Sequence, residues 1–184
     1  AQLRKRQRVC VELLQTESAY LEQLTFLVHC YEDPLVKAGV LNELDKKVVF
    51  INVRVLVQIH QELADTLKAK MEGADTPGPD YAIGAALCSI SPLLTFYKDY
   101  VNRYHDGGEL LRKLNEGKKF AGVLAKCKHG TASGGLNSLE NLLVVPVQRI
   151  PRYVLLLKEV LKYTPDSHPD HAACETALAK LENV

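Results

Sequence analysis

The segment from Leu139 to Thr164 constrains the fold more than any other part of this 184-residue sequence, because it is the most apolar long stretch. At 100° per residue most of its apolar side chains share one arc of a helix: Val147, Ile150, Val154, Leu157 and Leu161, with Tyr153 and Val160 beside them. A second stripe lies opposite, at spacings of four, three, four and three residues: Gln148, Arg152, Leu155, Glu159 and Lys162. A fully enclosed helix would be apolar all round. The pattern therefore predicts a core helix with one face open to a partner.

Two prolines interrupt the apolar pattern of this helix. Pro146 can begin its regular part, since the missing N–H of a first-turn proline costs nothing. Pro151 removes the donor that would have bonded the Val147 carbonyl, which predicts a bend at that point. A proline at that depth costs about 3 kcal/mol in an ordinary helix. The bend is either functional or merely tolerated, and in both cases Gln148 and Arg152 remain on one surface.

The residues LLVVPVQRIPRYVLLLKEVLKYTP resemble the third conserved region of the Dbl-homology (RhoGEF) domain. The usual form of that region is close to PVQRIxRYPLLLKELLK. This chain departs from it at Val154, where the family often has proline, and at Val145, where lysine is frequent. Neither departure removes a polar residue from the open stripe, and a match of this length is highly specific.

An amphipathic helix is expected from Leu3 to about Tyr31. Its apolar residues share an arc a little over a third of the wheel: Val9, Leu13, Leu14, Tyr20, Leu21, Leu24, Leu27, Val28 and Tyr31. Glu17 points into the middle of that arc, where a carboxylate is costly unless it is paired or lies at a partly open surface. Two interpretations follow. Glu17 forms a buried ion pair, with Arg149 as its mate, or it lies at an exposed seam and meets a partner.

Two further segments extend the family resemblance. ELLQTESAYLEQL, from Glu12 to Leu24, is similar to the first conserved region, ELLxTExxYLxxL. YAIGAAL and ISPLLTFYKDYVNRY, between Tyr81 and Tyr104, resemble the second. The three regions occur in the family's order and together cover nearly the whole chain.

Helical spacing continues along the rest of the chain, and no strand-like alternation stands out. After the first helix we expect a connector from Glu32 to Leu41, a helix from about Asn42 to Met71, and a loop from Gly73 to Asp80. A short helix near Tyr81–Ser89 follows, then a helix that Ser91 and Pro92 begin and that runs through Tyr104, and then shorter helices to about Lys128, separated at His105–Gly108 and Asn115–Lys119. The remaining elements are a loop from His129 to Ser138, a turn from Thr164 to His171 after the main helix, and a last helix from about Asp170. We therefore predict an all-α fold, an elongated bundle of long helices that forms one domain over residues 1–184.

The composition excludes several classes of protein. Apolar residues make up 47% and charged residues 24% of the chain, as is ordinary for a globular domain. A net charge of +1 argues against a nucleic-acid surface, and no segment has the length of a membrane span or the pattern of a signal peptide. The basic cluster from Arg4 to Arg8 is interpreted as a solvated helix end. The five cysteines include no C-x-x-C and indicate reduced, mostly buried thiols of a cytoplasmic protein. Recruitment to a membrane is expected only through other domains.

The sequence contains no constellation for covalent or metal chemistry. Six histidines are scattered, and only His168 and His171 are close, without a second pair of ligands. No H-E-x-x-H, G-x-S-x-G or Cys–His signature occurs, and the glycine-rich loop after His129 lacks the G-K-[ST] of a phosphate-binding loop. We therefore expect a binding protein without a cofactor or a metal.

The resemblance implies guanine-nucleotide exchange on a Rho-family small GTPase of the Rho, Rac or Cdc42 type, with no covalent catalytic residue and with a pleckstrin-homology domain downstream. It assigns Glu17 to the first switch loop of the GTPase. It assigns Gln148, Arg152 and Leu155 to the second switch region and its neighbourhood. Glu159 and Lys162, which continue the same open stripe, are candidates for additional contacts. Two other classes remain open. One is a Dbl-like module that binds a GTPase or another protein without exchange, and the other is an unrelated helical scaffold or curved lipid-binding bundle, which the near-neutral charge disfavours.

The last helix carries one more implication of the resemblance. Family members usually have another GTPase contact, an asparagine late in this helix. Aligning the apolar positions of the segment places that asparagine beyond Val184, with Asn183 on a neighbouring face. The apolar pattern also has no glycine or proline stop signal. We therefore expect a domain truncated at the end of its last helix.

Overall fold

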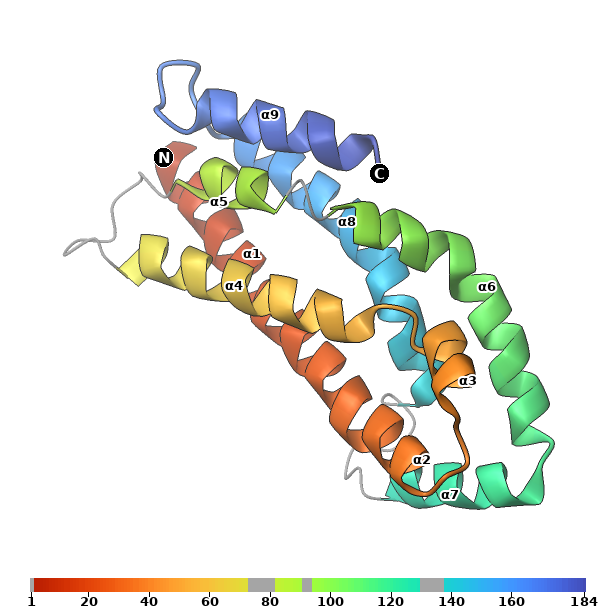
Figure 1. The fold of residues 1–184 in the computed structure, drawn as a ribbon. Coiled ribbons are helices and arrows are strands. Elements are labelled where there is room, and N and C mark those ends of the chain that lie inside the picture. The colour runs from red at the N-terminus through yellow and green to blue at the C-terminus, as the bar shows by residue number, and fades with distance from the viewer. Residues whose placement is uncertain (1, 73–81, 91–93, 130–137) are drawn as a thin grey trace. The chain divides into compact units, whose positions relative to one another are not determined.

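A computed structural model describes residues 2–72, 82–90, 94–129 and 138–184, and within these ranges it contains helices and no strand (Figure 1), which confirms the all-α prediction. The elements are α1 (Gln2–Leu27), a π-helical turn η1 (Val28–Glu32), α2 (Asp33–Lys37), α3 (Glu43–Val49), α4 (Val53–Glu72), α5 (Ile83–Ser89), α6 (Thr95–Asn115), α7 (Lys118–His129), α8 (Leu139–Lys162) and α9 (His171–Glu182). The loop expected at residues 73–80, residues 130–137 of the loop expected from His129 to Ser138, and the cap expected at Ser91 and Pro92 lie outside the described residues, whereas His129 is the last residue of α7.

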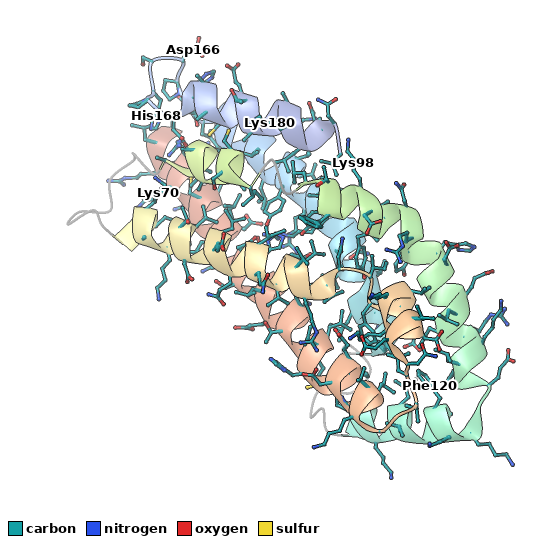
Figure 2. All side chains as sticks on the ribbon, viewed as in Figure 1. Lys70, Lys98, Phe120, Asp166, His168 and Lys180 are labelled. Carbon is teal, nitrogen blue, oxygen red and sulfur yellow. The ribbon has the colours of Figure 1, made fainter. Side chains whose placement is uncertain are left out.

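The chain divides into two compact units. Unit 1 comprises Ala1–Leu21, Gln58–Thr95 and Gln148–Val184, and unit 2 comprises Glu22–Val57 and Phe96–Val147. The helices α1, α4 and α8 contribute residues to both units. Within each unit, side chains fill the space between neighbouring helices (Figure 2). The single domain over residues 1–184 stays a prediction.

The core of unit 1 is built by one face each of α1, α4, α5, α8 and α9. Its buried side chains include Leu13, Tyr20, Leu63, Leu67, Ile83, Leu87, Tyr153, Leu157, Val160, Cys174 and Leu181. The helices α5 and α9 pack so closely that a Cβ atom on Gly84 would lie 2.4 Å from the backbone nitrogen of Cys174. Glycine at position 84 is therefore needed for this approach.

A buried ion pair joins the first turns of α1 to the residue that precedes α9. The Arg6 guanidinium is 0% exposed, and its Nη2 atom lies 2.8 Å from Oδ2 of Asp170. Arg6 Nε donates to the Thr164 hydroxyl at 2.9 Å, and the Gly84 N–H donates to the Asp170 carboxylate at 3.1 Å. One member of the basic cluster from Arg4 to Arg8 is thus buried, and the interpretation of the whole cluster as a solvated helix end is wrong for Arg6. The Asp170 carboxylate supplies the charge that makes this burial tolerable.

Unit 2 departs from the expected element boundaries. The segment expected to be a connector contains η1 and α2, because Pro34 lies at the start of α2, where its fixed φ suits a helix. The helix expected from Asn42 to Met71 is broken between α3 and α4, where Ile51 has a φ of 53°. Asn42 does begin α3, since its side chain accepts hydrogen bonds from the backbone N–H groups of Leu44 and Asp45.

The helix α6 continues through the sequence HDGG, which was expected to end it. Gly107 packs against α3, where a Cβ atom would lie 2.8 Å from the Val48 carbonyl oxygen. The glycine therefore serves close packing, and the helix passes through it.

The helix α8 begins at Leu139, as expected, and is one continuous α-helix to Lys162. Pro146 lies inside α8, about two turns after its start, and it is buried. The expectation that Pro146 begins the regular part of the helix is therefore wrong, because residues 139–145 are already helical.

All five cysteines lie within the described residues and are free thiols. Cys10 and Cys174 are buried, whereas Cys30, Cys88 and Cys127 are half-buried. Burial raises the pKa of Cys10 to about 11, so this thiol stays protonated.

Candidate functional site

The helices α1 and α8 lie side by side and run antiparallel within unit 1 (Figure 1). At one end, Arg6 Nε lies 2.9 Å from the Thr164 hydroxyl. At the other, Nη1 of Arg149 lies 3.3 Å from the Thr16 hydroxyl. Residue numbers therefore rise along α1 as they fall along α8, and the register pairs residue 12 with the neighbourhood of residue 155.

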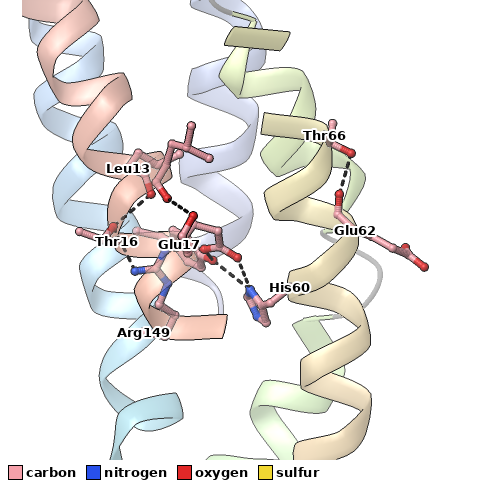
Figure 3. Close-up of polar contacts among 10 residues, drawn as sticks. Leu13, Thr16, Glu17, His60, Glu62, Thr66 and Arg149 are labelled. Carbon is pink, nitrogen blue, oxygen red and sulfur yellow. Dashed lines mark hydrogen bonds and ion pairs between the residues drawn. The ribbon is translucent and has the colours of Figure 1, made fainter. Parts of the chain in front are cut away.

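Glu17 lies in the interior of unit 1, where three helices meet (Figure 3). One carboxylate oxygen lies 2.6 Å from Nδ1 of His60, on α4. The other oxygen accepts hydrogen bonds from the Arg149 guanidinium and the Tyr153 hydroxyl, both on α8. We call Glu17, His60, Arg149 and Tyr153 the Glu17 cluster. It bonds α1 to α4 and to α8 through a single carboxylate.

Aromatic rings enclose the Glu17 cluster. The Arg149 guanidinium lies over the Tyr153 ring, at 4.1 Å from its centroid, and over the Tyr20 ring at 5.1 Å. The Tyr20 ring also meets the His60 ring edge-on, with centroids 4.8 Å apart. A guanidinium removed from water gains more from such contacts than an exposed one. The rings therefore compensate part of the cost of burying the Arg149 charge.

The electrostatics of the cluster keep Glu17 ionised. Burial by itself would raise the pKa of the Glu17 carboxyl, but the hydrogen bond from His60, the charges of His60 and Arg149, and the hydrogen bond from Tyr153 together hold this pKa below its ordinary value. Burial and the nearby Glu17 charge raise the pKa of Tyr153 well above its ordinary value, so the hydroxyl stays a donor. Burial by itself would lower the pKa of Arg149, but the nearby Tyr153 and Glu17 outweigh it, so this pKa lies above its ordinary value. The cluster thus holds a paired carboxylate and guanidinium.

Of the two interpretations of Glu17, the buried ion pair with Arg149 is confirmed. The expectation of an exposed seam at Glu17 is wrong, because donors from α4 and α8 surround the carboxylate and leave it 0% exposed. His60 was not singled out from the sequence. His60 lies on the apolar arc of α4, four residues after Leu56 and three before Leu63. A polar residue on an apolar arc indicates a buried polar group that needs a partner, and this signal could have identified His60.

The open stripe of α8 lies at the surface of unit 1 as the helical spacing predicts. Gln148, Arg152 and Lys162 are exposed, and Glu159 is half-buried. Leu155 is 69% exposed, whereas Leu157, two residues later, is 0% exposed. Leu155 is thus a large apolar side chain displayed among polar neighbours.

Lys5, Arg8 and Glu12 are exposed residues of α1. Helical spacing places them on the same side of α1 as Thr16, which bonds to Arg149 of α8, and Lys5 itself lies near the Tyr163 ring that follows α8. Glu12 belongs to the same ELLQTE motif as Glu17, but it lies off the apolar arc, and the antiparallel register brings it level with Leu155. Glu12 was not singled out from the sequence, although its position outside the arc indicates an exposed side chain. We call the combined surface the α1–α8 face; it consists of Lys5, Arg8, Glu12, Gln148, Arg152, Leu155, Glu159 and Lys162.

Among the described residues, no group of three or more His, Cys, Asp or Glu side chains is placed to hold a metal ion. In the same part of the chain, none of the helices combines the length and the apolar character that a membrane crossing requires.

The chain matches the family model of the RhoGEF domain over residues 9–184, and it therefore belongs to the RhoGEF, or Dbl-homology, domain family. Intersectin-1 of Homo sapiens is 28% identical to it over 182 residues, which is 98% of this chain and 10% of intersectin-1. The guanine exchange factor for Rac 30 of Dictyostelium discoideum is 30% identical over 182 residues, 99% of this chain and 11% of that protein. The chain thus spans about a tenth of the length of these two relatives.

The solved structures agree on the fold. The DH/PH fragment of PDZ-RhoGEF, in complex with human RhoA, matches with a TM-score of 0.86 at 19% identity, over 100% of this chain and 52% of that chain. At this identity the match concerns the helical fold alone.

Proposed function

We propose that this chain is a guanine-nucleotide exchange domain that binds a Rho-family small GTPase in its nucleotide-free form and so promotes GDP release. The observation that carries the proposal is the exposed stripe of α8, where Leu155 is 69% exposed between the polar side chains of Arg152 and Glu159. Arginine is enriched at the centres of protein–protein interfaces, and a large exposed apolar side chain such as Leu155 gains free energy when a partner covers it. Membership of the RhoGEF family, and a relative named as an exchange factor for Rac, support the choice of partner.

The proposed contacts with the second switch region and its neighbourhood are Gln148, Arg152 and Leu155, with Glu159 and Lys162 as additional contacts. For the first switch loop, the resemblance points to Glu17, which is 0% exposed and bonded to three side chains. We therefore assign to Glu17 the role of holding α1 against α8. Glu12, which is exposed and level with Leu155, supplies the carboxylate that meets the first switch loop.

The mechanism requires differential binding and no covalent step. A nucleotide held with nanomolar to picomolar affinity contributes about 12–16 kcal/mol to its complex. A surface that binds the empty GTPase better than the loaded one lowers nucleotide affinity by the same factor, because the two ligands are negatively coupled. Distortion of the switch loops that hold Mg²⁺ and the phosphates is the usual route for such coupling. A rigid α1–α8 face, held by the Glu17 cluster, suits this task.

The test is release of fluorescent GDP from a panel of Rho-, Rac- and Cdc42-type GTPases at equal concentration. We expect faster release from at least one member, and we expect excess GDP with Mg²⁺ to dissociate the complex formed with the empty GTPase. Equal affinity for the empty and the loaded forms would overturn the proposal, since a ligand without preference shifts no equilibrium. That result would favour the alternative, a helical module that binds a GTPase without exchange.

A further inference from the structure

One end of the α1–α8 face holds two lysines over one aromatic ring. The Lys5 ammonium lies 5.4 Å from the centroid of the Tyr163 ring, and the Lys162 ammonium lies 5.3 Å from the same centroid. Lys5 comes from the first turns of α1 and Lys162 from the last turn of α8. Both lysines are exposed. Cation–π attraction to the Tyr163 ring favours the position of each ammonium group.

Most carboxylates at this end of unit 1 lie near other partners, and the exposed Asp166 lies 3.5 Å from Nε2 of His171. The nearest to Lys162 is Glu159, at 3.6 Å, and that contact is open to solvent. Glu182 is paired with Lys158 at 2.7 Å, and Asp170 is paired with the buried Arg6. The exposed cations Lys5 and Arg8 on α1 have no ion pair with a described residue. An excess of positive charge therefore remains beside the stripe of α8, although the net charge of the whole chain is only +1.

We propose that Lys5 and Lys162, gathered over Tyr163, form a subsite for a carboxylate of the bound GTPase, and that this subsite selects GTPases with an acidic side chain about 10 Å from the point where Leu155 docks. The distance is the rise of a helix over the seven residues from Leu155 to Lys162, at about 1.5 Å per residue. The inference rests on the proposed function and adds to it the chemistry by which one GTPase is preferred over another.

A protein carboxylate fits this subsite better than a membrane surface does. Binding to anionic lipid generally uses a cluster of about four to eight cations. Here the cations are interspersed with the carboxylates of Glu12 and Glu159 along the same face. The subsite is also continuous with Leu155, which an apolar patch of a protein would cover. Because both ammonium groups are already near one ring, little ordering is required when a carboxylate arrives.

An exposed charged subsite acts mainly on the rate of association and on its dependence on salt. The test variant is Lys5→Glu with Lys162→Glu. The matched control is Lys98→Glu with Lys119→Glu, which makes the same change of net charge at two exposed lysines of α6 and α7. GDP release is measured against GTPase concentration at low and high NaCl, and thermal melting checks that both variants are folded.

For the double variant we expect kcat/KM at low salt to fall about tenfold, the rate at saturating GTPase to stay within about twofold of the original, and the salt dependence to flatten. The control should match the original protein. A GTPase in which the proposed carboxylate is replaced by lysine should recover activity with the double variant and lose it with the original chain. An unchanged kcat/KM, or an equal fall in the control, would overturn the subsite.

The remaining arms separate this inference from the proposed function and from a lipid surface. If the original chain releases no GDP from any GTPase, the proposed exchange function is wrong. The subsite is then tested by comparing how tightly the double variant and the control variant bind nucleotide-free GTPase. Equal binding, or none, counts against it. Sedimentation with vesicles containing phosphatidylserine is the lipid arm. Binding that the double variant loses, together with an unchanged kcat/KM, would show that the two lysines bind lipid instead.

Discussion

The carboxylate of Glu17 and the guanidinium of Arg149 are bonded to each other inside unit 1, with side-chain exposures of 0% and 3%. Each charge is tolerable there only because the other is present. The pair joins α1 to α8, the two helices whose exposed edges form the α1–α8 face. The geometry of the α1–α8 face therefore depends on this ion pair.

Removal of Glu17 should unfold the chain more readily. Glu17→Ala leaves the Arg149 charge buried and unpaired, which we expect to cost about 3–5 kcal/mol of unfolding free energy. For a chain of this size the midpoint of thermal melting should fall by about 6 °C or more. The matched variant is Glu12→Ala, at an exposed position of the same helix. It should change stability by no more than about 0.5 kcal/mol, yet lower kcat/KM for GDP release about tenfold or more. Similar melting midpoints for the two variants would contradict the assignment.

The lowered pKa of Glu17 makes stability depend on pH in a definite direction. The unfolded chain has the ordinary value, 4.5, and the folded value lies below it, so the folded state binds fewer protons in acid. The contribution of Glu17 is therefore fully present above about pH 4.5 and is lost as the pH falls through the folded value. Denaturant unfolding of the original chain and of Glu17→Gln between pH 6 and pH 3 measures this. The difference in unfolding free energy between the two should shrink toward pH 3, and a constant difference would show that Glu17 is not the titrating group.

Helical periodicity alone was sufficient to place the α8 face. The spacing of Gln148, Arg152 and Leu155 depends only on the 3.6-residue turn, and the exposed and buried sides of α8 follow it. The same reasoning left Glu17 undecided, because one helix's periodicity shows that a carboxylate points inward but not which side chains of other helices meet it. The partner His60, on α4, depends on how the helices pack.

The element boundaries that were misplaced depend on contacts between distant segments. The break at Ile51 involves a φ of 53°, a conformation that a β-branched residue rarely adopts and that no turn residue announces. The glycines of HDGG have the composition of a helix stop. They lie inside α6 because the Val48 backbone approaches Gly107, and nothing near Gly107 in the sequence indicates that contact.

The neighbouring glycines of α6 form a matched pair of sites for substitution. Gly108→Ala adds a methyl group that would meet no atom within 4 Å, so it should stabilise the helix by about 0.5–1 kcal/mol. Gly107→Ala would place a methyl group 2.8 Å from the Val48 carbonyl oxygen, so it should destabilise the fold by about 1–3 kcal/mol. Urea unfolding of the two variants should give midpoints on opposite sides of the original. A shift in the same direction for both would mean that α3 does not pack against Gly107 as described.

Leu155 and Leu157 separate binding from folding on a single helix. Leu155 is 69% exposed, and a glutamate at that position leaves the core of unit 1 intact. If Leu155 is an interface hot spot, its loss costs about 2 kcal/mol or more, which is about thirtyfold in kcat/KM for GDP release. Leu155→Glu should therefore melt like the original chain and exchange poorly, and Arg152→Glu should do the same.

Leu157→Glu is the control for this prediction. Its side chain is 0% exposed, so the variant would bury an unpaired carboxylate and should fail to fold. Circular dichroism and thermal melting distinguish the two outcomes before any exchange assay is run. If Leu155→Glu lost as much stability as Leu157→Glu, the two sides of α8 would have been assigned wrongly. If Leu155→Glu were both stable and fully active, the GTPase would have to dock elsewhere than on the α1–α8 face.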